Sequence, residues 1–456
     1  MAKKLWGGRF KKKIDRDFEE FSKSVQYDYK LAEFDIHHSL IHAQALTYAG
    51  IITKKEADKI SAALKMILRQ VKAGKFKPDI SAEDIHTQIH NRVQNQIGHP
   101  AAKLHSLRSR NDQVVFGEKL YCMTFAKEIF GGLSSLLKNV KSCAAGHKNC
   151  AFIGYTHTRR AQVILFGQYL QAYISMFQND VDRIDKFLQG LTAYIGAGAL
   201  AGTSITKQAY AKAIGAMGSF IKEFNVKMAV DTLDNVSGRD FIVEFLSILS
   251  IIQMHLSRLA EDLILYSTKE FGFVELPEEF CTGSSLMPHK KNPDFLELVR
   301  GYTGRIYGNL VSVLTMMKGL PLSYNRDMQL DKEPLFSSVE IVTAELKIMA
   351  KFIEKIKLNK AKIDEALQDE TLYATELAEY LVMKEKVAFR DAHDIVGKLI
   401  RYSEDKKTKI KSMSDEELGK FHKSLNKKVI NKVMNAQYAV TSKKSISRKV
   451  PKIKNA

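Results

Sequence analysis

Long runs of helical periodicity, interrupted by very few prolines, constrain the fold of this chain more than any other feature. Apolar residues recur at helical spacing beyond RNDQ at 110–113 and again beyond RRAQ at 159–162. Strand-like alternation rarely lasts more than four residues, and only 8 prolines interrupt the 456 residues. The sequence therefore predicts an all-α protein. The two helical faces consist of Phe116, Leu120, Met123, Phe130, Leu133 and Leu137, and of Phe166, Tyr169, Leu170, Tyr173, Ile174 and Phe177.

The helical patterns vary in length along the chain and so predict three domains. Residues 110–360 hold the longest patterns, including 299–317 and 336–352, and form a central long-helix bundle. Residues 1–109 form an N-terminal helical domain, and 361–456 form a C-terminal helical domain with a basic tail. The stretch GAGALAGTS at 196–204 lacks the spacing and the leading strand of a dinucleotide fingerprint. We interpret it as a glycine-rich connection between two long helices.

Composition bounds the environment and the partners of the chain. Its four cysteines form no C-x-x-C pair, and MAKKLWGGRF at the start lacks a signal-peptide apolar run, so we expect a reduced, cytoplasmic protein. The apolar stretch 241–265 contains charged residues, which favours a buried helix over a membrane span. Residues 405–456 hold 15 Lys or Arg and 4 Asp or Glu, and so carry +11 of the net charge of +19. No aromatic platform accompanies these lysines, so we expect no nucleic-acid partner.

Polar side chains gather in short islands, each beside a long helical pattern. Single islands are typical of helix caps, and Asp112 and Thr156 are candidate caps. Together they are too numerous for capping alone, and their Arg, Lys, Asn, Gln, Ser and Thr side chains are the donors that bind carboxylates. His86 and His90 have a helical metal-ligand spacing without a third ligand, so we expect no metal and no other cofactor. The islands are EDIH (83–86), LRSRNDQV (107–114), GYTHTRRAQ (154–162), GRD (238–240), GSSLMPHKKNP (283–293) and YNRDMQLDK (324–332).

These islands resemble the signature regions of the fumarase/aspartase superfamily. GSSLMPHKKNP is similar to the superfamily motif G-S-S-x-M-P-x-K-x-N-P. LWGGRF at 5–10, SRNDQV, GYTH…RAQ and the segment from KGLP to DK at 318–332 resemble the argininosuccinate lyase branch. The matches keep the order and spacing of the family from Leu5 to about Asp391 and fade in the basic tail.

The resemblance implies a β-elimination that splits argininosuccinate reversibly into arginine and fumarate, as in arginine biosynthesis. It implies that Ser284 is the general base, and that Lys290 and Asn292 hold the carboxylate next to the carbon that loses its proton. It places His157 on the acid side, with Glu297 as its carboxylate partner. A serine acts as a base only where its oxyanion is stabilised, and the backbone N–H groups of the Gly-Ser turn are candidates for that task.

The resemblance also implies the substrate-binding residues and the assembly. Asp84 and Arg239 occupy further polar positions of the family, where helix-end salt bridging is the alternative role. We expect a homotetramer with a twenty-helix core and with active sites shared between subunits. The implied binding residues are Ser24, Asp84, Asn111, Thr156, Arg239, Asn292, Tyr324, Gln329 and Lys332.

The sequence departs from the family at several positions. The family usually has Gly at Leu107, Gln at Arg159 and Pro at Val163, and an acidic residue at His90, Gly238 and Leu330. None of these positions carries the implied chemistry, so we expect effects on amine preference and rate. Two alternatives stay open: a fumarate-releasing lyase for another N-substituted aspartate, and a structural relative with weakened catalysis.

Overall fold

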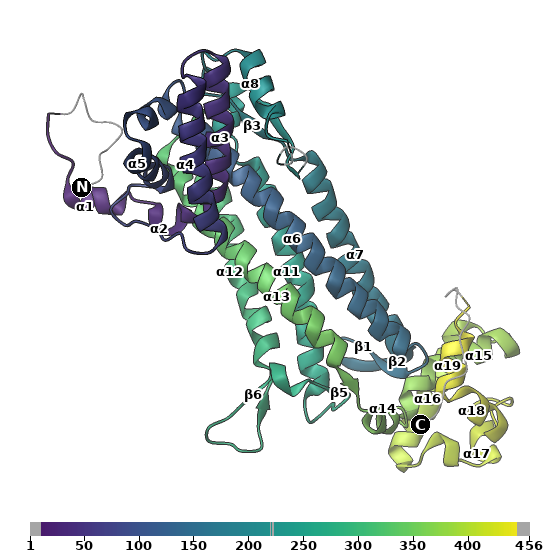
Figure 1. Cartoon of the computed structure of the whole chain (residues 1–456). Coiled ribbons are helices and arrows are strands. Elements are labelled where there is room, and N and C mark those ends of the chain that lie inside the picture. The colour runs from purple at the N-terminus through teal and green to yellow at the C-terminus, as the bar shows by residue number, and fades with distance from the viewer. Residues whose placement is uncertain (1–10, 219, 221–222, 445–456) are drawn as a thin grey trace. The chain divides into compact units, whose positions relative to one another are not determined.

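A computed structural model describes residues 11–218, 220 and 223–444. The LWGGRF motif at 5–10 and the end of the basic tail at 445–456 lie outside the described residues. The chain divides into two compact units, one of 1–131, 180–253 and 302–344 (unit 1) and one of 132–179, 254–301 and 345–456 (unit 2). Five of the described helices have more than 20 residues, and each contributes residues to both units (Figure 1). They are α6 (Arg110–Gly146), α7 (Phe166–Gly190), α11 (Asp240–Ser267), α12 (Asp294–Met317) and α13 (Lys332–Lys355).

Unit 1 adds shorter helices, among which α3 packs beside both α4 and α8 (Figure 1). Local sequence signals define several helix ends. Thr53 and Glu56 form a reciprocal capping box at the start of α4, and the Asp84 carboxylate caps α5. The shorter elements are α1 (Arg16–Phe21), α2 (Val25–Asp28), η1 (Tyr29–Leu31), α3 (Ala32–Tyr48), α4 (Lys54–Lys72), α5 (Ile85–Ile97), η2 (His99–His105), the parallel strands β3 (Ala193–Ile195) and β4 (Val226–Met228), α8 (Lys207–Gly215), α10 (Thr232–Ser237) and η4 (Arg326–Asp331).

The core of unit 1 lies between the long helices. Phe187 of α7 stacks on Phe245 of α11 with ring centroids 5.0 Å apart, and both rings are buried. Tyr121 of α6 contacts Phe336 of α13 at 4.7 Å between centroids. Aromatic pairs of this geometry add to the stabilisation that burial already provides, so they fix the helices that carry the polar islands.

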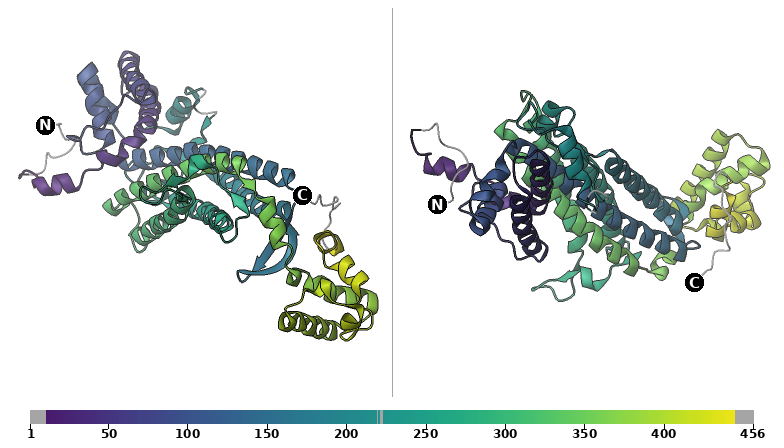
Figure 2. Two further views of the ribbon diagram at one scale, coloured as in Figure 1. Left: turned by 90° about the horizontal axis from the view of Figure 1, so that it is seen from below. Right: turned by 45° about the horizontal axis from the view of Figure 1, so that its top comes forward.

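Unit 2 combines the other ends of the long helices with a C-terminal helical group. Both views in Figure 2 show the light green to yellow helices of residues 374–442 gathered together. Leu346 of α13 packs against Gly132 of α6, where an added Cβ would lie 3.2 Å from the Leu346 Cβ. The further elements are the antiparallel pairs β1 (Ala151–Thr156) with β2 (Arg159–Leu165), β5 (Val274–Glu275) with β8 (Lys357–Leu358) and β6 (Thr282–Gly283) with β7 (Lys291–Asn292), then η3 (Glu278–Phe280), α14 (Lys360–Ala366), η5 (Glu370–Tyr373), α15 (Ala374–Glu385), α16 (Phe389–Lys406), η6 (Ile410–Ser412), α17 (Asp415–Gly419), α18 (Lys427–Val433) and α19 (Ala436–Ser442).

The predicted all-α class is confirmed, because the strands form only short two-stranded pairs in the described chain. Helix α11 is long and apolar enough to cross a membrane by composition, but 61% of its most apolar window is buried, as predicted for a core helix. All four cysteines are free. The boundaries at 109/110 and 360/361 stay a prediction.

The two candidate helix caps are wrong. Thr156 ends strand β1, and the following helix α7 begins only at Phe166. Asp112 lies inside the first turn of α6, where it is buried and accepts a hydrogen bond from the Gly196 N–H at 2.8 Å. At the start of α6, the Ser109 hydroxyl instead accepts the Asn111 N–H at 3.2 Å. Asp112 is thus engaged by a residue outside its island, whereas Thr156 pairs with Arg159 of its own island.

Candidate active site

A cavity of about 240 Å³ in unit 1 collects most of the predicted binding residues. Its wall comes from the segment before α2, the start of α5, the start of α6, and the η4–α13 junction. Six predicted residues line it, namely Ser24, Asp84, Asn111, Tyr324, Gln329 and Lys332. The other lining residues are Asp28, Glu83, His86, Arg110, Val114 and Arg326. Chain segments as far apart in sequence as Ser24 and Lys332 therefore meet around one small volume.

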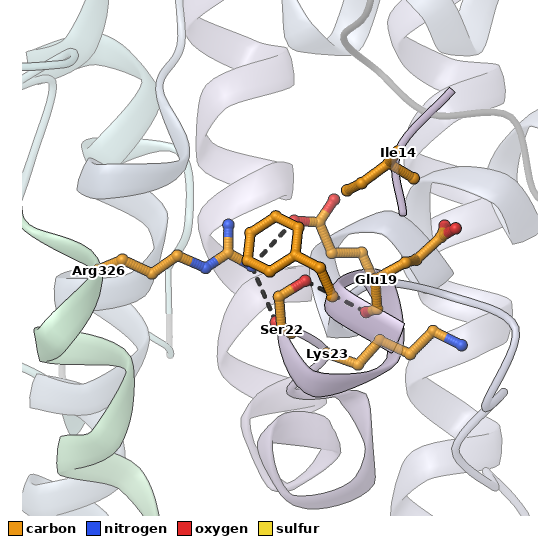
Figure 3. Close-up of a pocket in the computed structure, with 7 residues that line it drawn as sticks. Ile14, Glu19, Ser22, Lys23 and Arg326 are labelled. Atoms are coloured by element: carbon orange, nitrogen blue, oxygen red, sulfur yellow. Dashed lines mark hydrogen bonds and ion pairs between the residues drawn. The ribbon is translucent and has the colours of Figure 1, made fainter. Parts of the chain in front are cut away.

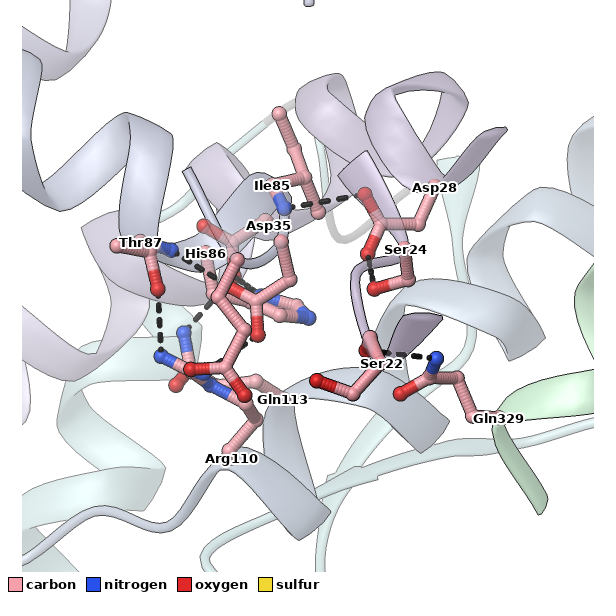
Figure 4. Close-up of polar contacts among 12 residues, drawn as sticks. Ser22, Ser24, Asp28, Asp35, Ile85, His86, Thr87, Arg110, Gln113 and Gln329 are labelled. Carbon is pink, nitrogen blue, oxygen red and sulfur yellow. Dashed lines mark hydrogen bonds and ion pairs between the residues drawn. The ribbon is translucent and has the colours of Figure 1, made fainter. Parts of the chain in front are cut away.

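Ser24 and Asp28 form the α2 side of the cavity (Figure 4). The Ser24 hydroxyl donates to Asp28 Oδ2 at 2.6 Å, and the Ile85 N–H donates to Asp28 Oδ1 at 3.0 Å. Burial, reinforced by the charge of Asp84, raises the pKa of Asp28 to about 6. This wall therefore changes its charge in the mildly acidic range.

Asp84 joins the α5 side to the α6 side. Its Oδ1 accepts the Thr87 N–H at 2.8 Å, and its Oδ2 pairs with Arg110 Nη1. Arg110 Nη2 also donates to the Thr87 hydroxyl at 3.2 Å. Asp84 is thus a helix cap and an ion-pair partner at once, which is the alternative role considered for it. The guanidinium of Arg110 is held at the cavity wall by these contacts.

Gln329 and Arg326 fasten the η4 segment to the segment before α2. Both side chains donate to the Ser22 carbonyl, Arg326 at 2.8 Å and Gln329 at 3.2 Å. Figure 3 shows Arg326 beside a second, smaller cavity of about 90 Å³, which Ile14, Glu19, Ser22 and Lys23 also line. Ser323, next to Tyr324, has a φ of 75°, a strained value for a residue other than glycine.

A buried network of four charges holds Lys332. Its Nζ lies 2.8 Å from Glu118 Oε1 and 2.8 Å from Asp331 Oδ1. Arg239 Nε lies 2.6 Å from Asp331 Oδ2 and 3.3 Å from Glu118 Oε2. Burial opposes the charge of Lys332, yet the two carboxylates raise its pKa overall, so the ammonium stays charged. Arg239 therefore shares both carboxylates with Lys332 and is not among the residues that line the cavity.

Histidines gather around the α5 wall, and His86 is one of the residues that line the cavity. His86 Nδ1 lies 2.7 Å from Asp35 Oδ1. Burial alone lowers the pKa of His86, but the charge of Asp35 outweighs burial, so the pKa of His86 is raised overall. The His90 ring lies 4.6 Å from the His105 ring, and burial lowers the pKa of both. The two histidines with metal-ligand spacing therefore have separate packing partners.

Thr156 and His157 lie at the β1–β2 turn in unit 2. Thr156 pairs with Arg159, so His157 and Thr158 form a two-residue turn, with φ values of 53° and 57°. Turns of this kind favour Gly, Asn or Asp, and a β-branched Thr at positive φ is an outlier. An irregularity between Gly154 and Tyr155 further distorts the strand that leads to the turn. Strain of this kind concentrates at functional sites.

Ser284, Lys290 and Asn292 lie on the β6–β7 loop, also in unit 2. The Ser284 hydroxyl oxygen accepts the backbone N–H groups of Leu286 at 3.3 Å and Met287 at 3.0 Å. Lys290 is exposed, and Asn292 pairs with Thr282 at the base of the loop. Glu297 lies exposed in the first turn of α12. Within the described part of this single chain, no ion pair joins Glu297 to His157.

The predicted residues thus fall into three places: the unit 1 cavity with Arg239 behind it, the β1–β2 turn, and the β6–β7 loop with the start of α12. The sequence alone did not predict a role for Asp28, Arg110, Arg326 or Glu118. Arg110 and Arg326 belong to two of the polar islands, so selecting every charged residue within the islands would have included them. Asp28 and Glu118 have no such signal, because their roles depend on burial in the folded chain.

The fold is shared with solved structures of fumarate-linked lyases. A crystal structure of EDDS lyase in complex with formate has a TM-score of 0.78 at 23% identity, covering 94% of this chain and 85% of that one. A class II fumarase from Schistosoma mansoni has a TM-score of 0.76 at 20% identity, covering 91% and 90%. At these identities the likeness concerns the fold alone. A family model described as lyase matches residues 8–308, which places the chain among the lyases.

Closer relatives give the family. A model described as argininosuccinate lyase C-terminal matches residues 371–441. The chain is 42% identical to the argininosuccinate lyase of Caldanaerobacter subterraneus subsp. tengcongensis over 93% of this chain and 95% of that protein. It is 45% identical to the argininosuccinate lyase of Clostridioides difficile over 92% and 94%. The chain belongs to the argininosuccinate lyase family and is a carbon–nitrogen lyase.

Proposed function

We propose that this protein is an argininosuccinate lyase that splits argininosuccinate reversibly into L-arginine and fumarate. The observation that carries this proposal is the unit 1 cavity, which six of the predicted binding residues line. The cavity presents both signs of charge, because Asp84 pairs with Arg110, Glu83 pairs with Arg326, and Asp28 and Lys332 also line it. Argininosuccinate has three carboxylates, a guanidinium and an ammonium group, so a wall of mixed charge suits it.

Ser284 takes the proton from the carbon next to the reacting carboxylate. The electron pair of the broken C–H bond moves into that carboxylate, and the C–N bond then breaks to leave fumarate. The two amide donors on the Ser284 oxygen support this role, because they stabilise an oxyanion there. Each preorganised donor of this kind contributes about 3–4 kcal/mol. Lys290 and Asn292 hold the carboxylate as its charge grows.

His157 supplies the proton that leaves with the arginine nitrogen, and Glu297 is the carboxylate partner of the His157 imidazole. The strained turn that carries His157 supports a functional role for it. Thr156 binds the substrate beside it. In this proposal the pairing of His157 with Glu297 forms in the assembled enzyme, since no ion pair joins the two side chains within the described part of the single chain.

The active enzyme is a homotetramer in which different subunits contribute the cavity, the β1–β2 turn and the β6–β7 loop. Helix α12 supports this assembly. Tyr307, Val311 and Leu314 recur at i, i+4 and i+7 and are 40%, 58% and 47% exposed in the single chain. An apolar helical face of this kind gains stability when a second copy covers it. The long helices of four copies then form the twenty-helix core.

Incubation with argininosuccinate, while fumarate is followed by its ultraviolet absorbance, tests the proposed function. We expect saturable fumarate release, with arginine formed in equal amounts. If fumarate is released only from another N-substituted aspartate, that compound and not argininosuccinate is the substrate. A folded tetramer without turnover of any such compound would indicate a structural relative.

The four free cysteines are consistent with the reducing cytoplasm that we propose for the enzyme.

A further inference from the structure

A buried carboxylate in unit 2 connects the C-terminal segment to the β1–β2 hairpin. Glu376 of α15 is 1% exposed, and its Oε1 lies 3.0 Å from Lys443 Nζ. The same Oε1 accepts a 3.2 Å hydrogen bond from Gln162 Nε2. Lys443 also pairs with Glu379, one turn further along α15, at 2.6 Å. Lys443 follows directly on α19, which itself packs against β1 and β2.

Gln162, which contacts Glu376, lies at the register shift of the β1–β2 hairpin. It lies in β2 opposite Gly154, where the register shifts between Gly154 and Tyr155. Two residues beyond Gly154, the hairpin carries Thr156 and then the strained His157 turn. A contact that holds Gln162 therefore acts on the strand irregularity that sets the direction of the turn.

We propose that Lys443 and Glu376 are positioning residues for the β1–β2 hairpin, acting through Gln162. The catalytic relevance of this contact rests on the proposed role of His157. Glu376 Oε2 is buried and has no hydrogen-bond partner among the described residues. The Lys443 ammonium is therefore the principal group that neutralises this carboxylate. A buried charge that loses its partner is strongly destabilising, so the hairpin moves or opens when Lys443 is removed.

Lys443→Met tests the proposal, with Lys444→Met as its matched control. Lys444 is the next residue and donates to the Thr441 carbonyl at 3.2 Å. We expect Lys443→Met to speed amide hydrogen exchange in residues 151–165 by about tenfold. We expect its kcat to fall between tenfold and hundredfold, roughly the effect of misplacing a reacting group, with KM changed far less. Lys444→Met keeps the wild-type values of all three quantities.

A second variant separates positioning from general destabilisation. In Lys443→Met/Glu376→Gln the amide keeps an acceptor for Gln162 and leaves no buried charge, so exchange and kcat return most of the way to wild type. Lys443→Arg keeps the charge and also retains activity. Removal of 445–456 leaves Lys443 in place and has no effect, whereas removal of 443–456 reproduces Lys443→Met.

The two readouts distinguish the possible failures. Unchanged exchange at 151–165 in a folded Lys443→Met protein overturns the proposal. A lower melting temperature with normal exchange and kcat below the transition also overturns it, because the pair is then only a structural ion pair. Faster exchange with unchanged kcat supports the contact and instead contradicts the catalytic role of the His157 turn.

Discussion

The hydroxyl group of Ser24 donates a 2.6 Å hydrogen bond to the Asp28 carboxylate, one helical turn away at the cavity wall. This pair places a predicted substrate-binding serine on a buried group whose pKa is about 6, raised mainly by burial. Above that pH the Ser24 hydroxyl donates to an ionised carboxylate, and below it the acceptor is a neutral carboxyl group, which is a weaker acceptor. The charge of this cavity wall therefore depends on pH through the Asp28 side chain.

Asp28→Asn should flatten the pH dependence of stability between about pH 4 and pH 6. In this window the folded protein binds a proton at Asp28 that the unfolded chain, with an ordinary pKa of 3.8, has released. Raising the pH therefore lowers the free energy of unfolding of the wild type, by about 3 kcal/mol for a shift of this size. Urea unfolding of both proteins at several pH values measures the difference. If the free energy of unfolding changes equally with pH in the two proteins, Asp28 has an ordinary pKa in the folded protein.

Lys332→Met should lower the free energy of unfolding by about 3–5 kcal/mol, because it leaves Glu118 and Asp331 buried with only one cation. Lys30→Met is the matched control, since Lys30 pairs with Glu340 at the surface. Its expected effect is below about 1 kcal/mol. Denaturant titration of both variants tests the contrast, and similar losses would mean that the buried network adds nothing beyond a surface pair.

Leu107→Gly should stabilise the protein by about 1 kcal/mol relative to Leu107→Ala. Leu107 has a φ of 58°, which glycine adopts without strain, and this gives a backbone reason for the glycine usual in the family. Both variants lose the contacts of the half-exposed leucine side chain, so the difference between them reports mainly on the backbone. Thermal melts of both variants provide the measurement. An alanine variant at least as stable as the glycine variant would refute the strain at this position.

Ser284→Ala should fold normally and lose turnover by at least about 10²–10⁴-fold, the usual contribution of a positioned base, while it still binds substrate. Ser285→Ala is its neighbour control, because Ser285 is exposed on the same loop. Fumarate release and a substrate-binding titration on each variant separate the two effects. Wild-type turnover by Ser284→Ala would show that another group is the base.

The sequence predicted the parts of this molecule whose signals are local. Helical periodicity predicted α12 and α13, which extend beyond 299–317 and 336–352 to Asp294–Met317 and Lys332–Lys355. The β1–β2 hairpin was missed because THTR has none of the Gly or Asn residues that mark a two-residue turn. The pairing of β1 with β2 closes the turn at His157 and Thr158, although neither residue favours a positive φ. Glu118 was missed for a similar reason, since only folding brings Lys332 and Arg239 to it.

The proposed composite active site makes the sharpest prediction about assembly. His157→Asn and Ser284→Ala should each be inactive as homotetramers. After the two proteins are mixed, dissociated and reassembled, activity should return. If a site takes His157 from one subunit and Ser284 from another, random reassembly gives about a quarter of the sites both residues intact.

A site built from one chain behaves differently, because every chain in the mixture lacks one of the two residues. The reassembled mixture would then form tetramers and stay as inactive as either parent. Native mass spectrometry establishes that mixed tetramers have formed, and fumarate release then decides between the two arrangements. Recovery close to a quarter of the wild-type rate assigns His157 and Ser284 of each site to different subunits, because no arrangement within one chain restores both residues.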